Sequence, residues 1–421
     1  MNQEKKVSYK VQLIIITALF FIFGFVTSLN GILMPYLKRA CELSDFVAAF
    51  VPFAFFSAYF IFSIPSGYII SKIGYKNGII LGLLICLSGA LLFLPAADTR
   101  IYMFFLLALG VLAAGITMLQ VAANPYMSLL GSPEKASSRI SLGGTFNSFG
   151  GFIGPVIGGY LILSKQKLSD ESIASLSIQD RLTFLTQEAA AVKLPYLVLA
   201  GCLLAFAVIV YFSQLPEVDI VTEENEAQNN AGKNIFRHKH FLLGVVAIFM
   251  YVGAEVSIAD FMIRYGQYLN IEKFTQYSGS FFLAGYGFAA MGGRFIGIFV
   301  LPKIKASYAI VFSTALAIVL ILISIFSSGY LALVAIMMVG ICNAVLWPSI
   351  FPLAIAGLGS ETKKGSSYLI MAVVGGAIIP LVVGYYSGKI GTQSAYFVPM
   401  LCYCYILYYG LFGYKNRPQT F

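Results

Sequence analysis

Long apolar runs separated by short polar connectors cover almost the whole chain. A helix that crosses a bilayer needs about 20 predominantly apolar residues, and most of these runs reach that length. The pattern predicts an all-α membrane protein with twelve transmembrane helices. The predicted spans cover residues 11–37, 46–71, 77–96, 101–130, 140–163, 194–214, 240–269, 274–301, 306–326, 329–358, 366–388 and 395–414.

Two connectors are longer than the others, at residues 164–193 and 214–239. The second is rich in acidic residues, then turns basic, and divides the spans into six plus six. A charged segment of this kind is typical of a solvated linker. We therefore predict an N-terminal half over residues 1–214, a cytoplasmic linker over 215–239 and a C-terminal half over 240–421.

A repeated motif supports two related halves. Gly150, Gly151 and Pro155 of the fifth span match Gly375, Gly376 and Pro380 of the eleventh in the pattern G-G-x-x-x-P-x-x-x-G-Y, 225 residues apart. In the fourth span, Gln120 precedes Asn124-Pro125, and 223 residues later Asn343 precedes Trp347-Pro348. Duplicated six-helix halves occur in secondary transporters. We interpret the glycines and prolines of the motif as helix-packing or gating positions, with plain tight packing as an equal alternative.

Composition narrows the class of protein. The chain has 421 residues, of which 59% are hydrophobic and 11% are charged, whereas soluble domains carry about 25% charged residues. This excludes a soluble enzyme or a disordered regulator. The net charge of +9 comes without a dense basic run, which argues against nucleic-acid binding. More Lys and Arg residues fall in the loops on the side of the termini, so we expect both termini in the cytoplasm.

Polar side chains within the spans are the candidates for a binding site, because they are costly in a membrane. The amides Asn30, Gln120, Asn124, Asn147 and Asn343 can donate to and accept from sugar hydroxyls, and Trp347 could stack on an apolar sugar face. Helix–helix hydrogen bonding is an equal alternative for each single amide.

Acidic residues are rare in the spans. Glu255 and Asp260 are the two acidic residues in predicted span interiors, and Asp260 lies one turn from Arg264. Glu255 has no partner nearby in sequence and is the candidate ion-coupling group, but hydroxyls or Arg294 could satisfy it instead. His238 and His240 are expected to be solvated in the linker. No catalytic triad or metal-ligand spacing is present, so we expect no enzyme and no cofactor.

Several segments resemble the fucose permease family of the major facilitator superfamily. They are Leu29–Leu33 (LNGIL), Leu119–Tyr126 (LQVAANPY), Thr145–Gly150 (TFNSFG), Tyr251–Ile258 (YVGAEVSI) and Val374–Pro380 (VGGAIIP). The resemblance covers nearly the whole chain. It implies a twelve-helix sugar transporter in which Asn147 matches a position implicated in sugar binding.

Two positions depart from the proton-coupled fucose permeases, which carry an acid where this chain has Gly31 and another where it has Gln120. The forms found here look instead like the glucose/galactose branch. We therefore expect a monomeric importer of a hexose in the cytoplasmic membrane, coupled to sodium or protons. An uncoupled facilitator and a fucose or other monosaccharide permease remain alternatives. A drug or organic-anion exporter would need a wider or more basic cavity.

Overall fold

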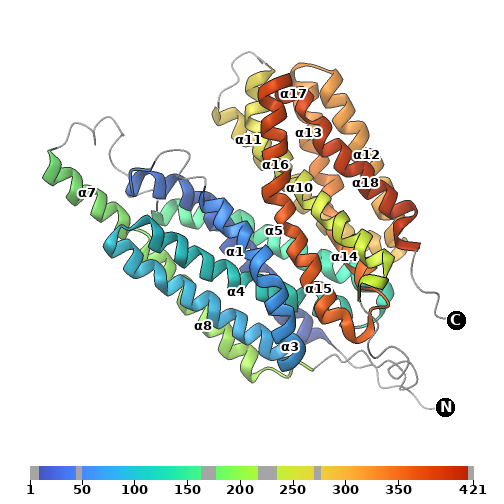
Figure 1. Cartoon of the computed structure of the whole chain (residues 1–421), viewed down its shortest axis with the longest axis horizontal. Helices are drawn as coiled ribbons and strands as arrows, with labels where there is room; N and C mark the ends of the chain where they lie inside the picture. The colour runs from blue at the N-terminus through green and yellow to red at the C-terminus, as the bar shows by residue number, and fades with distance from the viewer. Residues whose placement is uncertain (1–8, 44–49, 163–176, 217–234, 270–275, 416–421) are drawn as a thin grey trace. The chain divides into compact units, whose positions relative to one another are not determined.

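The computed structural model describes residues 9–43, 50–162, 177–216, 235–269 and 276–415, all of them in helices and short connections. The helices before the linker region are α1 (Lys10–Ala40), α3 (Phe50–Thr99), α4 (Tyr102–Leu129), α5 (Ala136–Ile162), α7 (Ile178–Ala190) and α8 (Lys193–Phe212). Those after it are α10 (Lys239–Tyr268), α11 (Gln276–Val300), α12 (Ala306–Phe326), α13 (Gly329–Ala344), α14 (Leu346–Ile355), α15 (Thr362–Met371), α16 (Gly375–Ile390), α17 (Thr392–Ala395) and α18 (Phe397–Leu411). Figure 1 shows these helices along the chain.

The predicted spans are confirmed as helices, with differences at four of them. α3 contains both the second and the third predicted span, and Gly74 breaks it with a φ of 83°, a conformation that glycine adopts at little cost. The tenth span is interrupted at Val345 between α13 and α14. Because Pro348 has no N–H to donate to the carbonyl of Ala344, the helix cannot continue regularly there. A 3₁₀ turn at Ala372–Val374 interrupts the eleventh span.

Ten segments of the described residues are long and apolar enough to cross a membrane by length and composition. The segment Phe53–Thr99, at 47 residues, is long enough for two crossings. α5, which is rich in glycine and serine, is not among the ten. α7 was not predicted at all, because its residues are polar and lie in the long connector.

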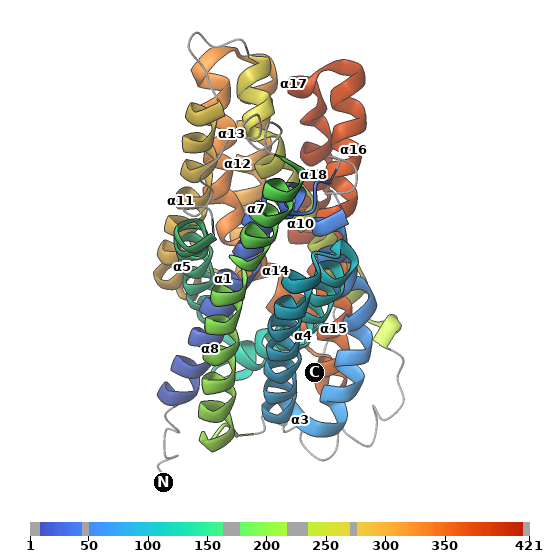
Figure 2. The same cartoon turned by 90° about the vertical axis from the view of Figure 1, so that its left-hand side faces the viewer.

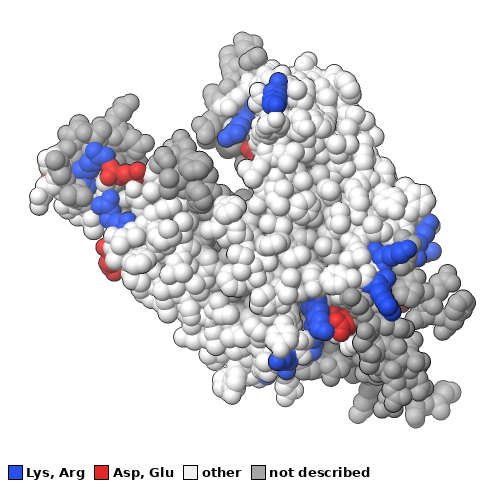
Figure 3. All heavy atoms as spheres, in the orientation of Figure 1, with Lys and Arg blue, Asp and Glu red and all other residues white. Residues whose placement is uncertain are grey.

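The outward faces of the helices are apolar, as expected for a bilayer. On α12, Phe312 is 72% exposed and Phe326 83%, whereas Ser313 and Thr314 are buried on the inner side. On the face shown in Figure 3, charged groups gather near helix ends and leave the middle of the helices uncharged. In a soluble protein, charged groups are spread over the whole exposed surface of a helix.

The chain divides into two compact units. One takes its described residues from the ranges 19–123 and 149–217, and the other from 1–18, 124–148 and 218–421. In the first, α3 packs along α8; in the second, α10 packs against α16 and α18, and α11 against α13. Figure 2 shows the same helices from the side. The boundaries predicted for the two halves stay a prediction, and most of the predicted linker lies outside the described residues.

Glycines allow the closest helix contacts in each unit. A Cβ atom at Gly150 of α5 would collide with the carbonyl of Phe21 in α1, and one at Gly375 would collide with the carbonyl of Phe249 in α10. The fifth and first spans therefore pack together as the eleventh and seventh do. This equivalence extends the sequence repeat into three dimensions. A gating role for these glycines stays a prediction, and the side chain of Pro155 lies outside the described part of the chain.

Candidate substrate and coupling site

An ion pair joins α10 to α11. Nη2 of Arg294 lies 3.5 Å from Oε1 of Glu255, with the side chains 16% and 23% exposed respectively. A buried carboxylate is tolerated in a membrane only where a partner compensates its charge. The sequence left Glu255 either unpaired or held by hydroxyls or Arg294. In the structure Glu255 is paired with Arg294, so the prediction that Glu255 is unpaired is wrong.

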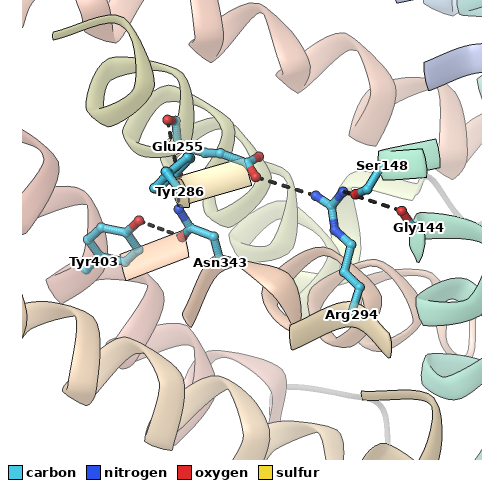
Figure 4. A network of polar contacts seen from close by, with 7 residues as sticks. All are labelled: Gly144, Ser148, Glu255, Tyr286, Arg294, Asn343 and Tyr403. Atoms are coloured by element: carbon cyan, nitrogen blue, oxygen red, sulfur yellow. Dashed lines mark hydrogen bonds and ion pairs between the residues drawn. The ribbon is translucent and has the colours of Figure 1, made fainter. Parts of the chain in front are cut away.

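Arg294 also reaches α5, as Figure 4 shows. Its Nη1 donates to Oγ of Ser148 at 2.5 Å and lies 3.5 Å from the carbonyl of Gly144. One turn away, Ser141 donates to the carbonyl of Arg294 at 2.6 Å, and Ser138 donates to the carbonyl of Ile298 at 2.7 Å. The start of α5 is therefore hydrogen-bonded along one side of α11, and we call this row of hydrogen bonds the α5–α11 seam. Arg294 lies between the seam and Glu255.

Asn343 lies at the centre of a buried network next to this ion pair. Its Nδ2 donates to the hydroxyl of Tyr286 at 2.7 Å, and its Oδ1 accepts from the hydroxyl of Tyr403 at 2.6 Å. Tyr286 in turn donates to the backbone carbonyl of Glu255 at 3.4 Å. Asn343 is fully buried, so both ends of its amide are bound to protein.

The other unit contains an equivalent pair. Nε2 of Gln120 in α4 donates to the hydroxyl of Tyr59 in α3 at 2.8 Å. Gln120 and Asn343 are 223 positions apart, and Tyr59 and Tyr286 are 227 apart. Sequence reasoning missed both tyrosines, since the chain has 26. Aligning the two halves at the offset of the repeat would have brought them to nearly matching positions.

Asn124 and Trp347 are hydrogen-bonded to each other. Nε1 of Trp347 donates to Oδ1 of Asn124 at 3.1 Å, and the indole stacks on Phe351 with the ring centroids 5.7 Å apart. The two residues occupy corresponding positions of the repeat.

Three candidates from the sequence remain. Asn147 is half-buried in α5, and the side chain of Asn30 lies outside the described part. Asp260 is exposed, and the Arg264 guanidinium lies over the ring of Phe261, 5.4 Å from its centroid.

The histidine expectation was wrong for His240. This side chain is fully buried in α10, with Nε2 at 2.9 Å from the carbonyl of Ala356. Apolar residues follow His240 in α10, and because they pack inside the protein the first turn of the helix is buried with them. A group of three His, Cys, Asp or Glu residues that could hold a metal ion was not found among the described residues.

Comparison with known proteins decides the family. The family model of the major facilitator superfamily matches residues 16–380. The chain belongs to the major facilitator superfamily. This confirms the predicted family and, with it, a multi-pass membrane transporter.

Individual superfamily members match along their whole length. The chain is 40% identical to the glucose/galactose transporter of Brucella abortus, over 97% of this chain and 95% of the relative. It is 41% identical to a putative glucose/galactose transporter of Helicobacter pylori, over 99% and 100%. The crystal structure of the Escherichia coli fucose:proton symporter superposes with a TM-score of 0.88 at 31% identity, covering 98% of this chain and all of that one.

Proposed function

We propose that this protein imports a hexose such as glucose or galactose across the cytoplasmic membrane, as a monomer with both termini in the cytoplasm. The observation that carries the proposal is the full-length identity of 40% and 41% to two proteins named for glucose/galactose transport. The fucose permeases carry acidic side chains where this chain has Gly31 and Gln120, and this difference supports the glucose/galactose branch rather than the fucose branch.

The sugar site is assigned to the region around Asn124 and Trp347. Gln120 lies one turn before Asn124 and is half-buried. Together with Asn147 and Asn30, these residues supply amides and one aromatic ring, the combination expected in a pocket with apolar walls and a few oriented polar groups. Asn343 is assigned a supporting part, since its amide is bound by two tyrosines.

Glu255 is assigned to ion coupling through Arg294. A sodium ion or a proton that binds the carboxylate competes with the guanidinium and weakens the ion pair. The positive charge of Arg294 then depends more on Ser148 and the carbonyls of α5. Binding of the ion would thereby alter the seam between α5 and α11, and a rocking motion of the halves must open that seam.

Hexose uptake into proteoliposomes tests the proposal. With sodium and proton gradients imposed separately, the wild-type protein should concentrate labelled glucose or galactose under one of them. Glu255→Gln should abolish concentration but retain exchange of internal for external sugar. Failure to transport any hexose overturns the substrate, and undiminished concentrative uptake by Glu255→Gln overturns the coupling assignment.

An uncoupled facilitator is the second candidate, and the ion pair itself favours it. Because Arg294 already compensates the charge of Glu255, the carboxylate needs no bound cation to be stable in the membrane. In that case neither gradient concentrates sugar, and wild-type protein and Glu255→Gln equilibrate it alike. An organic-anion exporter is disfavoured by the same contact, since the positive charge of Arg294 is compensated.

A further inference from the structure

A basic cavity lies at one end of the unit that contains residues 124–148. It has a volume of about 580 Å³ and is bounded by the start of α1, the end of α4 and the loop that leads into α5. Three of the lining residues are cationic: Lys10, Lys135 and Arg139. The lining contains no Asp or Glu, and the nearby Glu134 is exposed. Three positive charges thus line the cavity, and its lining among the described residues is free of acidic side chains.

Arg139 lines this cavity and is held in place by hydrogen bonds. Its Nε, Nη1 and Nη2 donate to the carbonyls of Met127, Ser132 and Ser128 at 2.9, 2.9 and 2.5 Å. These carbonyls lie at and just beyond the carboxyl end of α4, where a cation is favoured by the helix dipole. The side chain is 9% exposed, so the guanidinium holds the loop in place around the cavity.

The two lysines differ from Arg139. Lys10 and Lys135 are exposed, and among the described residues neither ammonium group has a hydrogen bond or ion pair with the protein. Tyr9, Ser132 and Ser138 add hydroxyl groups to the lining, while the half-buried Leu13 adds apolar surface. A ligand that matches this lining has an anionic head with several oxygen acceptors and an apolar portion.

We propose that this cavity binds the headgroup of an anionic phospholipid. The inference rests on the proposed topology, which places the start of α1, the end of α4 and the start of α5 together at the cytoplasmic face. Headgroups of the inner leaflet lie at that level, and basic pockets between transmembrane helices bind anionic headgroups there. The phosphate lies between Lys10 and Lys135, and the first acyl carbons lie against Leu13.

Native mass spectrometry of the purified full-length protein tests this with phosphatidylglycerol and phosphatidylcholine as probes. Wild-type protein should retain phosphatidylglycerol in preference to phosphatidylcholine. Each lysine beside an anionic headgroup contributes roughly fivefold in affinity, so Lys10→Gln/Lys135→Gln should weaken that retention by about twenty-five-fold. The matched control Lys239→Gln/Lys415→Gln removes the same charge from two exposed positions on the same predicted side, at the start of α10 and after α18, and should leave retention unchanged.

Three results would overturn the proposal. Equal loss in both double variants would mean general surface attraction, and equal retention of the two lipids would mean no anionic site. Stabilisation of the wild-type protein by inorganic phosphate as strong as that by phosphatidylglycerol, and lost in Lys10→Gln/Lys135→Gln, would assign the cavity to free phosphate. Hexose uptake by this variant reports separately on the proposed transport, because the lysines lie outside the assigned sugar site.

Discussion

An amide bound to a tyrosine hydroxyl occurs in both units, but its surroundings differ. In one unit, Tyr286 and Tyr403 hold the amide of Asn343 from both sides, and all solvent is excluded from it. In the other, Tyr59 binds the amino group of Gln120, and the glutamine stays half-buried. The amide–tyrosine hydrogen bond is thus present in both units, but the exposure of the amide differs between them. Gln120, the more accessible amide, is therefore the better candidate for contact with sugar.

The largest predicted effect is the loss of helix packing within each unit when Gly150 or Gly375 is replaced. Gly150→Ala and Gly375→Ala each place a Cβ against a backbone carbonyl, and no rotamer change relieves that collision. We expect either variant to lose most of its folded, monodisperse protein in fluorescence-detected size exclusion.

Each unit offers a matched control for this loss. A Cβ at Gly110 of α4 or Gly287 of α11 meets nothing within 4 Å. Because alanine favours helix over glycine by about 1 kcal/mol, Gly110→Ala and Gly287→Ala should fold at least as well as the wild-type protein. If only one of the paired glycines proves sensitive, the two units do not depend on equivalent helix contacts.

The comparison of the two amides predicts that replacing Asn343 mainly lowers stability, whereas replacing Gln120 mainly weakens transport. Asn343→Ala leaves the hydroxyls of Tyr286 and Tyr403 buried without their partner, at a cost of about 2–4 kcal/mol. Gln120→Ala leaves one buried hydroxyl, that of Tyr59, without this partner and should cost less, about 1–2 kcal/mol. It should instead raise the half-saturating hexose concentration about tenfold. Thermal unfolding and initial uptake rates measure the two effects. The reverse assignment of effects would make Asn343 the sugar ligand.

The ion pair offers a third, smaller test. Because both side chains keep some exposure, we expect Glu255→Gln and Arg294→Gln each to destabilise the protein by about 1–2 kcal/mol, each leaving one charge uncompensated. The double variant should be less destabilised than the sum of the two, and thermal unfolding of all four proteins gives the coupling. Additive losses would show that the 3.5 Å contact contributes nothing to stability.

Sequence patterns predicted the spans well because helix length and apolar character are local properties. The close pairing of Gly150 with α1 and of Gly375 with α10 followed the predicted repeat. Other features depended on residues far apart in sequence. Arg294 meets Glu255 from 39 positions away and Ser148 from 146, and no local periodicity reports such contacts. The break at Val345 could have been predicted from Pro348, whereas the burial of His240 depends on tertiary packing.

The smallest expected effect concerns the contact between corresponding positions of the repeat. Trp347→Phe keeps an aromatic ring for stacking on Phe351 but removes the N–H that binds Asn124, at a cost of about 0.5–1 kcal/mol. Asn124→Ala removes the same hydrogen bond from the other side. If binding of the sugar depends on this hydrogen bond, the two substitutions should change the half-saturating hexose concentration non-additively, with a coupling of about 0.5–1 kcal/mol in a double-mutant cycle. Trp347→Ala in the same uptake assay separates stacking from hydrogen bonding, because it removes both. Full additivity between Asn124 and Trp347 would mean that they act on the sugar independently, as two separate contacts.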